Sequence, residues 1–345
     1  MFKVNTDGTG FTNLCTVASY MNPDLVLSAN TLYGTTGQGG SSGYGTVFKV
    51  NTDGTGFTTL YTFTRGDEAN PSGLLLSGGV LYGTTTDCCG SEVGYGTVFS
   101  LGTDGTGFTT LYRFSGGDGD QPLDMILSGS TLYGTTYYGG NTGNGTVFAI
   151  NTDGTGFASL YNFSANLGQT GTFYGTIGDG ACPGGVLALS GNTLYGTARF
   201  GGAAGNGTIF SVNTDGTGFT NLHDFTASDP VTGANSDGVN PSGRFILSGN
   251  TLYGTTETGG KSRGGTIFSL SLQQGSAPQL SLTPSGPNVI LTWPTNATGF
   301  TLQSTTDLGS SALWTTNTPA PVIVNDQNVV TIPISGTQMF FRLSQ

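Results

Sequence analysis

Short runs of apolar residues, separated by polar turn residues, recur along most of this chain. One unit holds four such runs, at 73–77 (GLLLS), 80–85 (VLYGTT), 96–100 (GTVFS) and 108–114 (FTTLYRF). Each run has the length of a β-strand and is bounded by turn residues, and no segment has the period of an amphipathic helix. The pattern therefore predicts an all-β fold built from units of four antiparallel strands.

The last two runs of a unit are joined by Asn-Thr-Asp-Gly-Thr-Gly, as in the stretch 45–63, GTVFKVNTDGTGFTTLYTF. Asp53 and Gly54 are residue types that tolerate positive φ, and Gly56 suits the additional left-handed position of a bulged turn. These residues predict a β-hairpin. The same hairpin is expected at 2–17, 96–114, 145–163 and 207–225.

The second run carries Leu-Tyr-Gly-Thr in every unit, which sets the period of the repeat at about 50 residues. Its leucines are Leu32, Leu81, Leu132, Leu194 and Leu252. A lone four-stranded sheet cannot bury both of its faces, so such sheets stack around an axis as the blades of a β-propeller. A β-solenoid is the alternative, but its coils are shorter and need no tight hairpin in each repeat. We therefore predict a β-propeller.

Strand counting predicts five blades over residues 1–272. Complete units run over 24–63, 73–114, 124–163 and 184–225, and 243–272 supplies three strands of a fifth unit. The N-terminus supplies a third and a fourth strand, at 2–5 and 11–17. We expect 11–17 to pair beside 265–272, so that the two ends of the unit complete the fifth blade and leave no open sheet edge.

The repeat period stops after Leu272. Residues 273–277 have the composition of a polar linker, and 278–345 hold roughly six or seven short strands, in which Val289, Leu291 and Trp293 alternate on one face. This segment resembles a small fibronectin type III or immunoglobulin-like β-sandwich, without the cysteines of an immunoglobulin disulfide. We expect a separate module that serves as a spacer or an attachment.

The order of runs within a unit, GLLLSG, TLYGTTYYGG, GTVFAIN and TDGTGF, resembles that of a kelch repeat. The kelch glycine doublet and its paired Tyr and Trp are only partly present, so this likeness covers the blade architecture alone. The stretch GTVFKVNTDGTGFTTLYTF followed by LLLSGGVLYGTT is similar to the consensus of the GloVer tandem repeat, over residues 1 to about 272. That family consists of bacterial surface proteins with various C-terminal sorting anchors. The resemblance implies a secreted or surface-displayed protein and brings no assigned activity.

The composition of the chain limits which binding partners and which cellular location we expect. The 9 basic and 20 acidic residues give a formal charge of −11, which repels phosphate backbones and anionic lipids. The chain contains no run of about 18 apolar residues, the length that a membrane-spanning helix needs. We expect a monomer with no nucleic-acid partner and no membrane insertion, in an extracellular or cell-surface setting. Met1–Val4 lacks the features of a signal peptide, so we expect that signal upstream of a truncated start.

No catalytic residue is indicated by the sequence. His223 is the only histidine, and it stands where other repeats carry tyrosine, which favours packing over general-base chemistry. A single histidine excludes a histidine-dependent triad and a multi-histidine metal site. The four cysteines share no repeat position, which argues against a zinc site. Cys88 and Cys89 could pair with each other, one of them could reach Cys182, or all could be unpaired.

Aspartates recur at the corners of the hairpins, at Asp7, Asp53, Asp104, Asp153 and Asp215. Each turn supplies one carboxylate, whereas Ca²⁺ takes six to eight oxygen ligands, so turn geometry is the favoured explanation. No metal site is defined by these residues. We expect no cofactor, with Ca²⁺ as the alternative.

A second acidic set lies in the loops between blades, where Asp is followed four residues later by Pro. In a meander these loops share one face with the tyrosine-bearing loops, opposite the hairpin corners. The candidate binding residues on this face are Asp67, Glu68, Asp118, Asp120, Asp179, Asp237, Tyr44, Tyr95, Tyr137 and Tyr138. Turn chemistry alone would explain the Asp and Pro. Asp124 adds negative charge that a turn does not require.

Three functions are consistent with this acidic and aromatic face. The first is a non-enzymatic secreted or cell-surface module that binds or displays an extracellular glycan, a surface polymer or a cation. The second is a secreted hydrolase or lyase that uses two carboxylates there; a glycosidase would need them about 5 to 10 Å apart. The third is a purely structural spacer. We favour the first.

Overall fold

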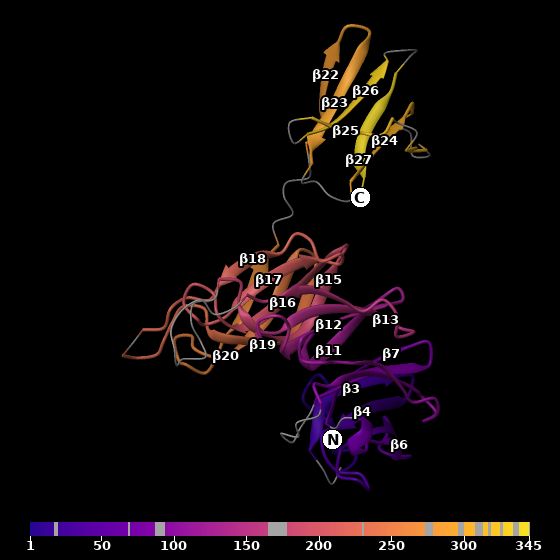
Figure 1. Cartoon of the computed structure of the whole chain (residues 1–345), viewed down its shortest axis with the longest axis vertical. Coiled ribbons are helices and arrows are strands. Elements are labelled where there is room, and N and C mark those ends of the chain that lie inside the picture. Colours follow the sequence, from indigo (N-terminus) through magenta and orange to yellow (C-terminus); the bar gives the residue numbers. More distant parts are fainter. Residues whose placement is uncertain are drawn as a thin grey trace. The chain divides into compact units, whose positions relative to one another are not determined.

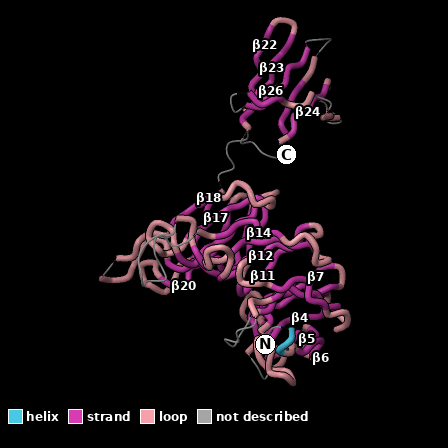
Figure 2. Tube along the Cα trace, in the orientation of Figure 1, coloured by secondary structure: helices cyan, strands magenta, loops and turns pink. Residues whose placement is uncertain are grey.

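The computed structural model of the chain divides into two compact units, Met1–Leu270 and Ser271–Gln345 (Figure 1). The structure describes residues 1–16, 20–67, 70–86, 94–164, 178–229, 231–272, 279–295, 300–307, 313–316, 319–324, 327–333 and 338–344. Over these residues it contains strands, turns and one 3-10 turn, η1 (Arg65–Asp67), and no α-helix (Figure 2). The prediction of an all-β fold is therefore confirmed.

Four sheets of four antiparallel strands follow one another in the first unit, each as a meander. Sheet 1 is β3 (Met21–Ser28), β4 (Thr31–Thr36), β5 (Thr46–Asn51) and β6 (Thr58–Thr62). Sheet 2 is β7 (Pro71–Ser77), β8 (Val80–Thr85), β9 (Thr97–Gly102) and β10 (Thr109–Arg113). Sheet 3 is β11 (Asp120–Ser128), β12 (Thr131–Tyr138), β13 (Thr146–Asn151) and β14 (Ala158–Asn162). Sheet 4 is β15 (Ala181–Ser190), β16 (Thr193–Phe200), β17 (Thr208–Asn213) and β18 (Thr220–Asp224).

The predicted hairpin connects the last two strands of each of these sheets. In sheet 1, Asp53 Oδ1 accepts hydrogen bonds from Thr55 N at 2.8 Å and Thr55 Oγ1 at 2.7 Å, while Gly54 and Gly56 have φ of 90° and 67°. The backbone bond from Thr55, followed by the hydroxyl bond, lowers the pKa of Asp53. Equivalent Asp–Thr bonds occur at Asp7, Asp104, Asp153 and Asp215. These aspartates therefore serve the turns.

Neighbouring sheets are joined by an aromatic stack that repeats along the unit. A tyrosine on the fourth strand stacks on the hairpin phenylalanine of the next sheet, with ring centroids 3.9 Å apart for Tyr61–Phe108, 3.8 Å for Tyr112–Phe157 and 3.7 Å for Tyr161–Phe219. A second phenylalanine beside each tyrosine is buried, as at Phe63 and Phe163. Each hydrophobic cluster thus lies between two sheets, which stack as the blades of a propeller do.

The two ends of the first unit differ from our expectation. The N-terminal strands β1 (Phe2–Lys3) and β2 (Thr12–Asn13) pair with each other, and sheet 5 has three strands, β19 (Val239–Ser248), β20 (Thr251–Thr258) and β21 (Ile267–Ser271). Among the described strand pairs, none joins 11–17 to 265–272. The hairpin turn at Asp7 brings β1 to β2 at a much smaller loop-closure cost than pairing with a strand over 250 residues away.

In the second unit, β22 (Ser281–Ser285), β23 (Asn288–Pro294), β26 (Gln327–Pro333) and β25 (Val322–Val324) form one sheet, and β24 (Thr301–Thr305) and β27 (Phe340–Ser344) form another. Val289, Leu291 and Trp293 are buried and their neighbours are less so, as the alternation predicted. Leu302 and Val330 bring the two sheets into one core. The comparison with fibronectin or immunoglobulin sandwiches stays a prediction.

Candidate functional site

The predicted aspartates between the sheets are partners of the turns in which they lie. Asp118 accepts hydrogen bonds from Ser115 N at 2.8 Å and Tyr112 Oη at 2.6 Å. Asp179 does the same with Ser164 N at 2.9 Å and Tyr161 Oη at 2.7 Å. Asp67 accepts from Thr64 N, and Asp237 from Thr226 N. Their carboxylates are thus committed to ordering the loop between one sheet and the next, the alternative that turn chemistry offered.

The other predicted residues are spread over several loops and strands. Tyr44 packs against the cluster between sheets 1 and 2, and Tyr95 is 44% exposed. Tyr137 and Tyr138 form an edge-to-face pair with centroids 4.6 Å apart, and Asp120 is opposite Tyr138 in the β11–β12 ladder. Glu68, Cys88 and Cys89 lie outside the described residues, while Cys15 and Cys182 are free thiols. The ten predicted residues therefore do not form one described cluster.

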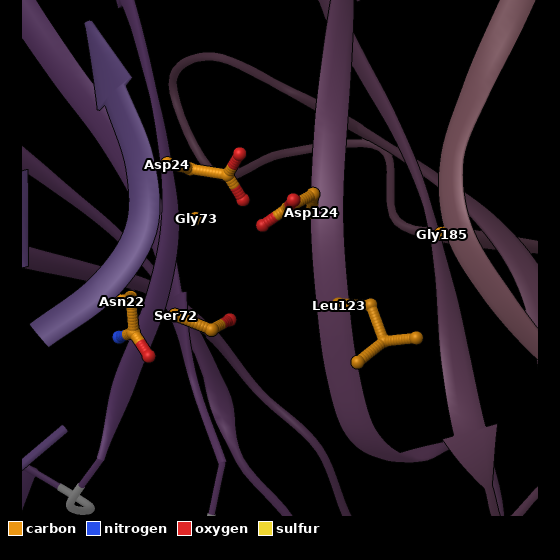
Figure 3. A pocket seen from close by; sticks show the side chains of 7 residues that line it. All are labelled: Asn22, Asp24, Ser72, Gly73, Leu123, Asp124 and Gly185. Atoms are coloured by element: carbon orange, nitrogen blue, oxygen red, sulfur yellow. The ribbon is translucent and has the colours of Figure 1, made fainter. Parts of the chain in front are cut away.

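A cavity of about 210 Å³ lies instead between the first strands of sheets 1 to 4. We call it the central cavity, and Figure 3 shows the seven residues that line it: Asn22, Asp24, Ser72, Gly73, Leu123, Asp124 and Gly185. These residues come from β3, β7, β11 and β15, and most are polar or glycine. They lie in the first half of these strands, near the end that the inter-sheet loops enter.

Asp24 and Asp124 point toward each other across the central cavity (Figure 3). Burial, followed by a hydrogen bond to Asp24 and repulsion from its charge, raises the pKa of Asp124 to about 7, against the weaker opposite effect of Arg244. Arg244 Nη2, on β19, is 3.7 Å from Asp24 Oδ1. A neighbouring like charge opposes ionisation of a buried carboxyl group. Asp124 therefore keeps its proton to higher pH than an ordinary aspartate.

The absence of a side chain at Gly73 makes this arrangement possible. A Cβ at Gly73 would lie 1.5 Å from Asp124 Oδ1, so any larger residue would displace the carboxylate. The backbone N–H of Gly73 also donates a hydrogen bond to Asp124. Gly73 is therefore a positioning residue for Asp124.

The first strands of the repeats differ from one another at a position beside the central cavity. The residue before the one that pairs with the Leu-Tyr-Gly glycine is Asp24 in sheet 1, Gly73 in sheet 2 and Asp124 in sheet 3. In sheets 4 and 5 a register shift spans this position, and counting back from the pairs of Ala188 and Ile246 gives Val186 and Arg244. The hairpins and stacking aromatics hardly change between repeats. A comparison of the aligned repeats at this position would have located the site from sequence.

Metal binding and membrane crossing have no candidate in the described part of the chain. In these ranges no three His, Cys, Asp or Glu side chains are grouped so that they could hold a metal ion. The described residues also contain no helix with the length and apolar character needed to span a bilayer.

His223 is the counterpart of the stacking tyrosines, and its Nε2 lies 2.8 Å from Asp237 Oδ2. Burial raises the pKa of Asp237, but hydrogen bonds from Thr226 and His223 outweigh it and lower the pKa overall. A group with a depressed pKa stabilises the fold above its unfolded pKa and loses that contribution as the pH falls through its folded pKa. We expect the Asp237 carboxylate to raise the melting temperature at pH 6. This stabilisation should be lost progressively as the pH falls below about 4.

This expectation is tested by measuring melting temperatures from pH 6 to pH 2.5 for the wild type and Asp237→Asn. The variant should be less stable at pH 6 by roughly 1 kcal/mol and should approach the wild type at the acid end. A constant difference across the whole range would show that the charge of Asp237 plays no part.

The stacked sheets and the cavity between their first strands define a tandem-repeat protein with propeller-like blades. A family model described as the Gloeobacter/Verrucomicrobia repeat matches residues 1–180 and 171–285, and the chain belongs to this family. The resemblance to the GloVer repeat is thereby confirmed.

Solved structures with a similar fold include two oligogalacturonate lyases. One, in complex with manganese, has a TM-score of 0.51 at 11% identity over 79% of this chain and 71% of that chain. The other, from Vibrio parahaemolyticus, has a TM-score of 0.52 at 10% identity over 79% and 72% of the two chains. At these identities the likeness concerns the fold alone. No curated protein matches the sequence.

Proposed function

We propose that the first unit is a five-bladed propeller that binds a polar ligand, an extracellular glycan in the first instance, in the central cavity. The protein then acts as a secreted or cell-surface binding or display module, with the second unit as a sandwich-like spacer. The observation that carries this proposal is the divergence of the repeats at Asp24, Asp124 and Arg244 within a scaffold that otherwise repeats. A scaffold requirement would favour the same residue in each sheet, whereas a ligand contacts each sheet differently.

The lining of the cavity suits a ligand rich in hydroxyl groups. Carboxylates accept hydrogen bonds from hydroxyls, and Asn22 and Ser72 add amide and hydroxyl groups. Arg244 lies beside this lining, 3.7 Å from Asp24. We therefore propose the site on the first strands of the sheets and not at the inter-sheet aspartates. It stays near the same end of the blades.

A second candidate is hydrolysis or elimination by the same carboxylates. Its specific support is Asp124, whose pKa of about 7 suits a general acid or base. However, Asp24 and Asp124 are in hydrogen-bond contact, whereas glycosidase carboxyl groups are about 5 to 9.5 Å apart to accommodate the sugar or a water molecule. We therefore rank binding above catalysis.

The proposal predicts saturable binding of a neutral or charged oligosaccharide that depends on Asp124. We expect a calorimetric titration against a glycan panel to detect binding to the wild type and a loss of about tenfold or more in Asp124→Asn, because a charge-assisted acceptor becomes a neutral one. The triple variant Asp67→Asn, Asp118→Asn, Asp237→Asn should be less stable but keep its affinity.

Each other result has a defined meaning. If the triple variant loses binding while Asp124→Asn keeps it, the site lies in the inter-sheet loops. If no glycan binds, the cavity has no such ligand and the spacer function is favoured. Product formation by chromatography, with loss in Asp124→Asn, would instead establish catalysis.

A further inference from the structure

The central cavity has more acidic than basic groups around it. Asp24 on β3 and Asp124 on β11 face each other. Arg244 on β19 is the nearby cation, with its Nη2 at 3.7 Å from Asp24 Oδ1. Gly73 and Gly185, from β7 and β15, bring no charged side chain to the lining. If both carboxyl groups were ionised, these described groups would leave one negative charge without a counter-charge.

A proton on Asp124 would offset that charge in the unliganded protein. Asp124 faces Asp24 in the cavity, and burial, followed by the hydrogen bond to Asp24, raises the pKa of Asp124 to about 7. The two carboxyl groups face each other, so the proton lies at a position that a small cation could occupy. A ligand that brings its own positive charge can take that place, and the proton then leaves to solvent.

We infer that the central cavity takes a ligand with a single ammonium group, such as an amino sugar, which replaces the proton between Asp24 and Asp124. This inference rests on the proposed function and specifies its ligand class. An ammonium group has three N–H donors, and two of them would reach the two carboxylates. The third would find an acceptor on Ser72 or Asn22.

Asn22 is arranged to accept. Its amide nitrogen donates to Thr35 Oγ1 at 2.9 Å and to the Pro71 carbonyl, so its Nδ2–H groups are used within the fold. The side-chain oxygen is the remaining polar atom of Asn22 at the cavity. Ser72 Oγ is 2.6 Å from Thr84 Oγ1, which can serve as the donor of that bond and leave Ser72 able to accept another.

Other ligand charges fit less well. A divalent cation would need six to eight oxygen ligands, and Arg244 would repel it from Asp24. A neutral sugar would satisfy hydrogen bonds but would not supply the missing charge. A single ammonium gives the lining a balanced charge, and the formal charge of −11 on the chain attracts such a ligand at long range.

The test compares D-glucosamine with N-acetyl-D-glucosamine and glucose, which share most hydroxyl groups but carry no charge. Titrations at pH 6.5 in two buffers of different ionisation enthalpy count the protons released. We expect glucosamine to bind about tenfold or more tightly than its acetylated form and to release up to one proton per site. The acetylated form and glucose should release none.

Two variants act in opposite directions. Asp124→Asn keeps the size of the side chain but holds no exchangeable proton, so glucosamine should lose its preference and its proton release. Arg244→Gln removes the competing cation, so the ratio of the glucosamine affinity to the affinity for the acetylated sugar should rise by a few fold. Asp104→Asn changes the net charge equally at an exposed hairpin corner and should alter neither ligand by more than about twofold.

The outcomes separate this inference from the proposed function. Equal binding of the three sugars without proton release overturns the ammonium inference and leaves glycan binding in place. Proton release by CaCl₂ but not by glucosamine identifies a metal site and overturns it as well. Failure of all three sugars, together with failure of the wider glycan panel, overturns both.

Discussion

Replacing Phe163 by alanine is expected to lower the free energy of unfolding of the first unit by about 3–5 kcal/mol. Phe163 is fully buried between sheets 3 and 4, with its ring 5.2 Å from Phe210 and 5.3 Å from Tyr161 in edge-to-face geometry. Its removal would leave a cavity at the interface through which the two sheets are coupled. Urea unfolding followed by circular dichroism measures the change.

Phe57→Ala is the matched control. Phe57 holds the same hairpin position as Phe108, Phe157 and Phe219, but it is 45% exposed and contacts Phe48 alone among the described aromatic pairs. We expect a loss of at most about 1.5 kcal/mol. Similar losses in both variants would mean that the inter-sheet stacks do not hold the unit together.

Gly73→Ala should abolish the carboxyl pair while leaving the fold intact. The added Cβ would be 1.5 Å from Asp124 Oδ1, so the carboxylate must turn away from Asp24, and the pKa of Asp124 should fall from about 7 toward its ordinary value near 4. An NMR titration of the aspartate carboxyl carbons would follow this change. Binding of any central-cavity ligand should weaken by about tenfold or more.

Gly117→Ala provides the comparison, because a Cβ there would meet no atom within 4 Å and its φ, like that of Gly73, is not left-handed. It should leave both the titration and the binding unchanged. An Asp124 titration that persists in Gly73→Ala would show that the pair forms without this space.

Local chemistry made much of the fold predictable. The Asp-Gly-Thr-Gly turns dictate their hairpins through the φ of two glycines and the hydrogen bonds of one aspartate, and these interactions span only a few residues. The alternation of Val289, Leu291 and Trp293 likewise specified which face of β23 is buried. Signals of this kind survive in a single sequence because cause and effect lie within one hairpin or strand.

The central cavity was less accessible to sequence reasoning. Asp24, Asp124 and Arg244 are separated from one another by 100 to 220 residues of sequence, and only the stacking of sheets brings them together. The inter-sheet aspartates were more conspicuous because they repeat, yet repetition reflects their use in every turn. The pairing of the unit's ends was also hard to predict, because the N-terminal strands could pair with each other or with a strand far away in sequence. The local hairpin of β1 and β2 formed.

The aromatic stacks that join the sheets are made by residues other than those that line the cavity. Tyr112 lies on the fourth strand β10, Phe157 in a hairpin and Phe163 directly after β14, whereas Asp24 and Asp124 lie on first strands. A substitution at Asp24 or Asp124 can therefore change the cavity without removing these stacks. Duplication of a repeat would copy the stacking residues and leave the positions of Asp24 and Asp124 free to diverge. Under the proposed function, new binding properties could therefore arise from single substitutions on the first strands.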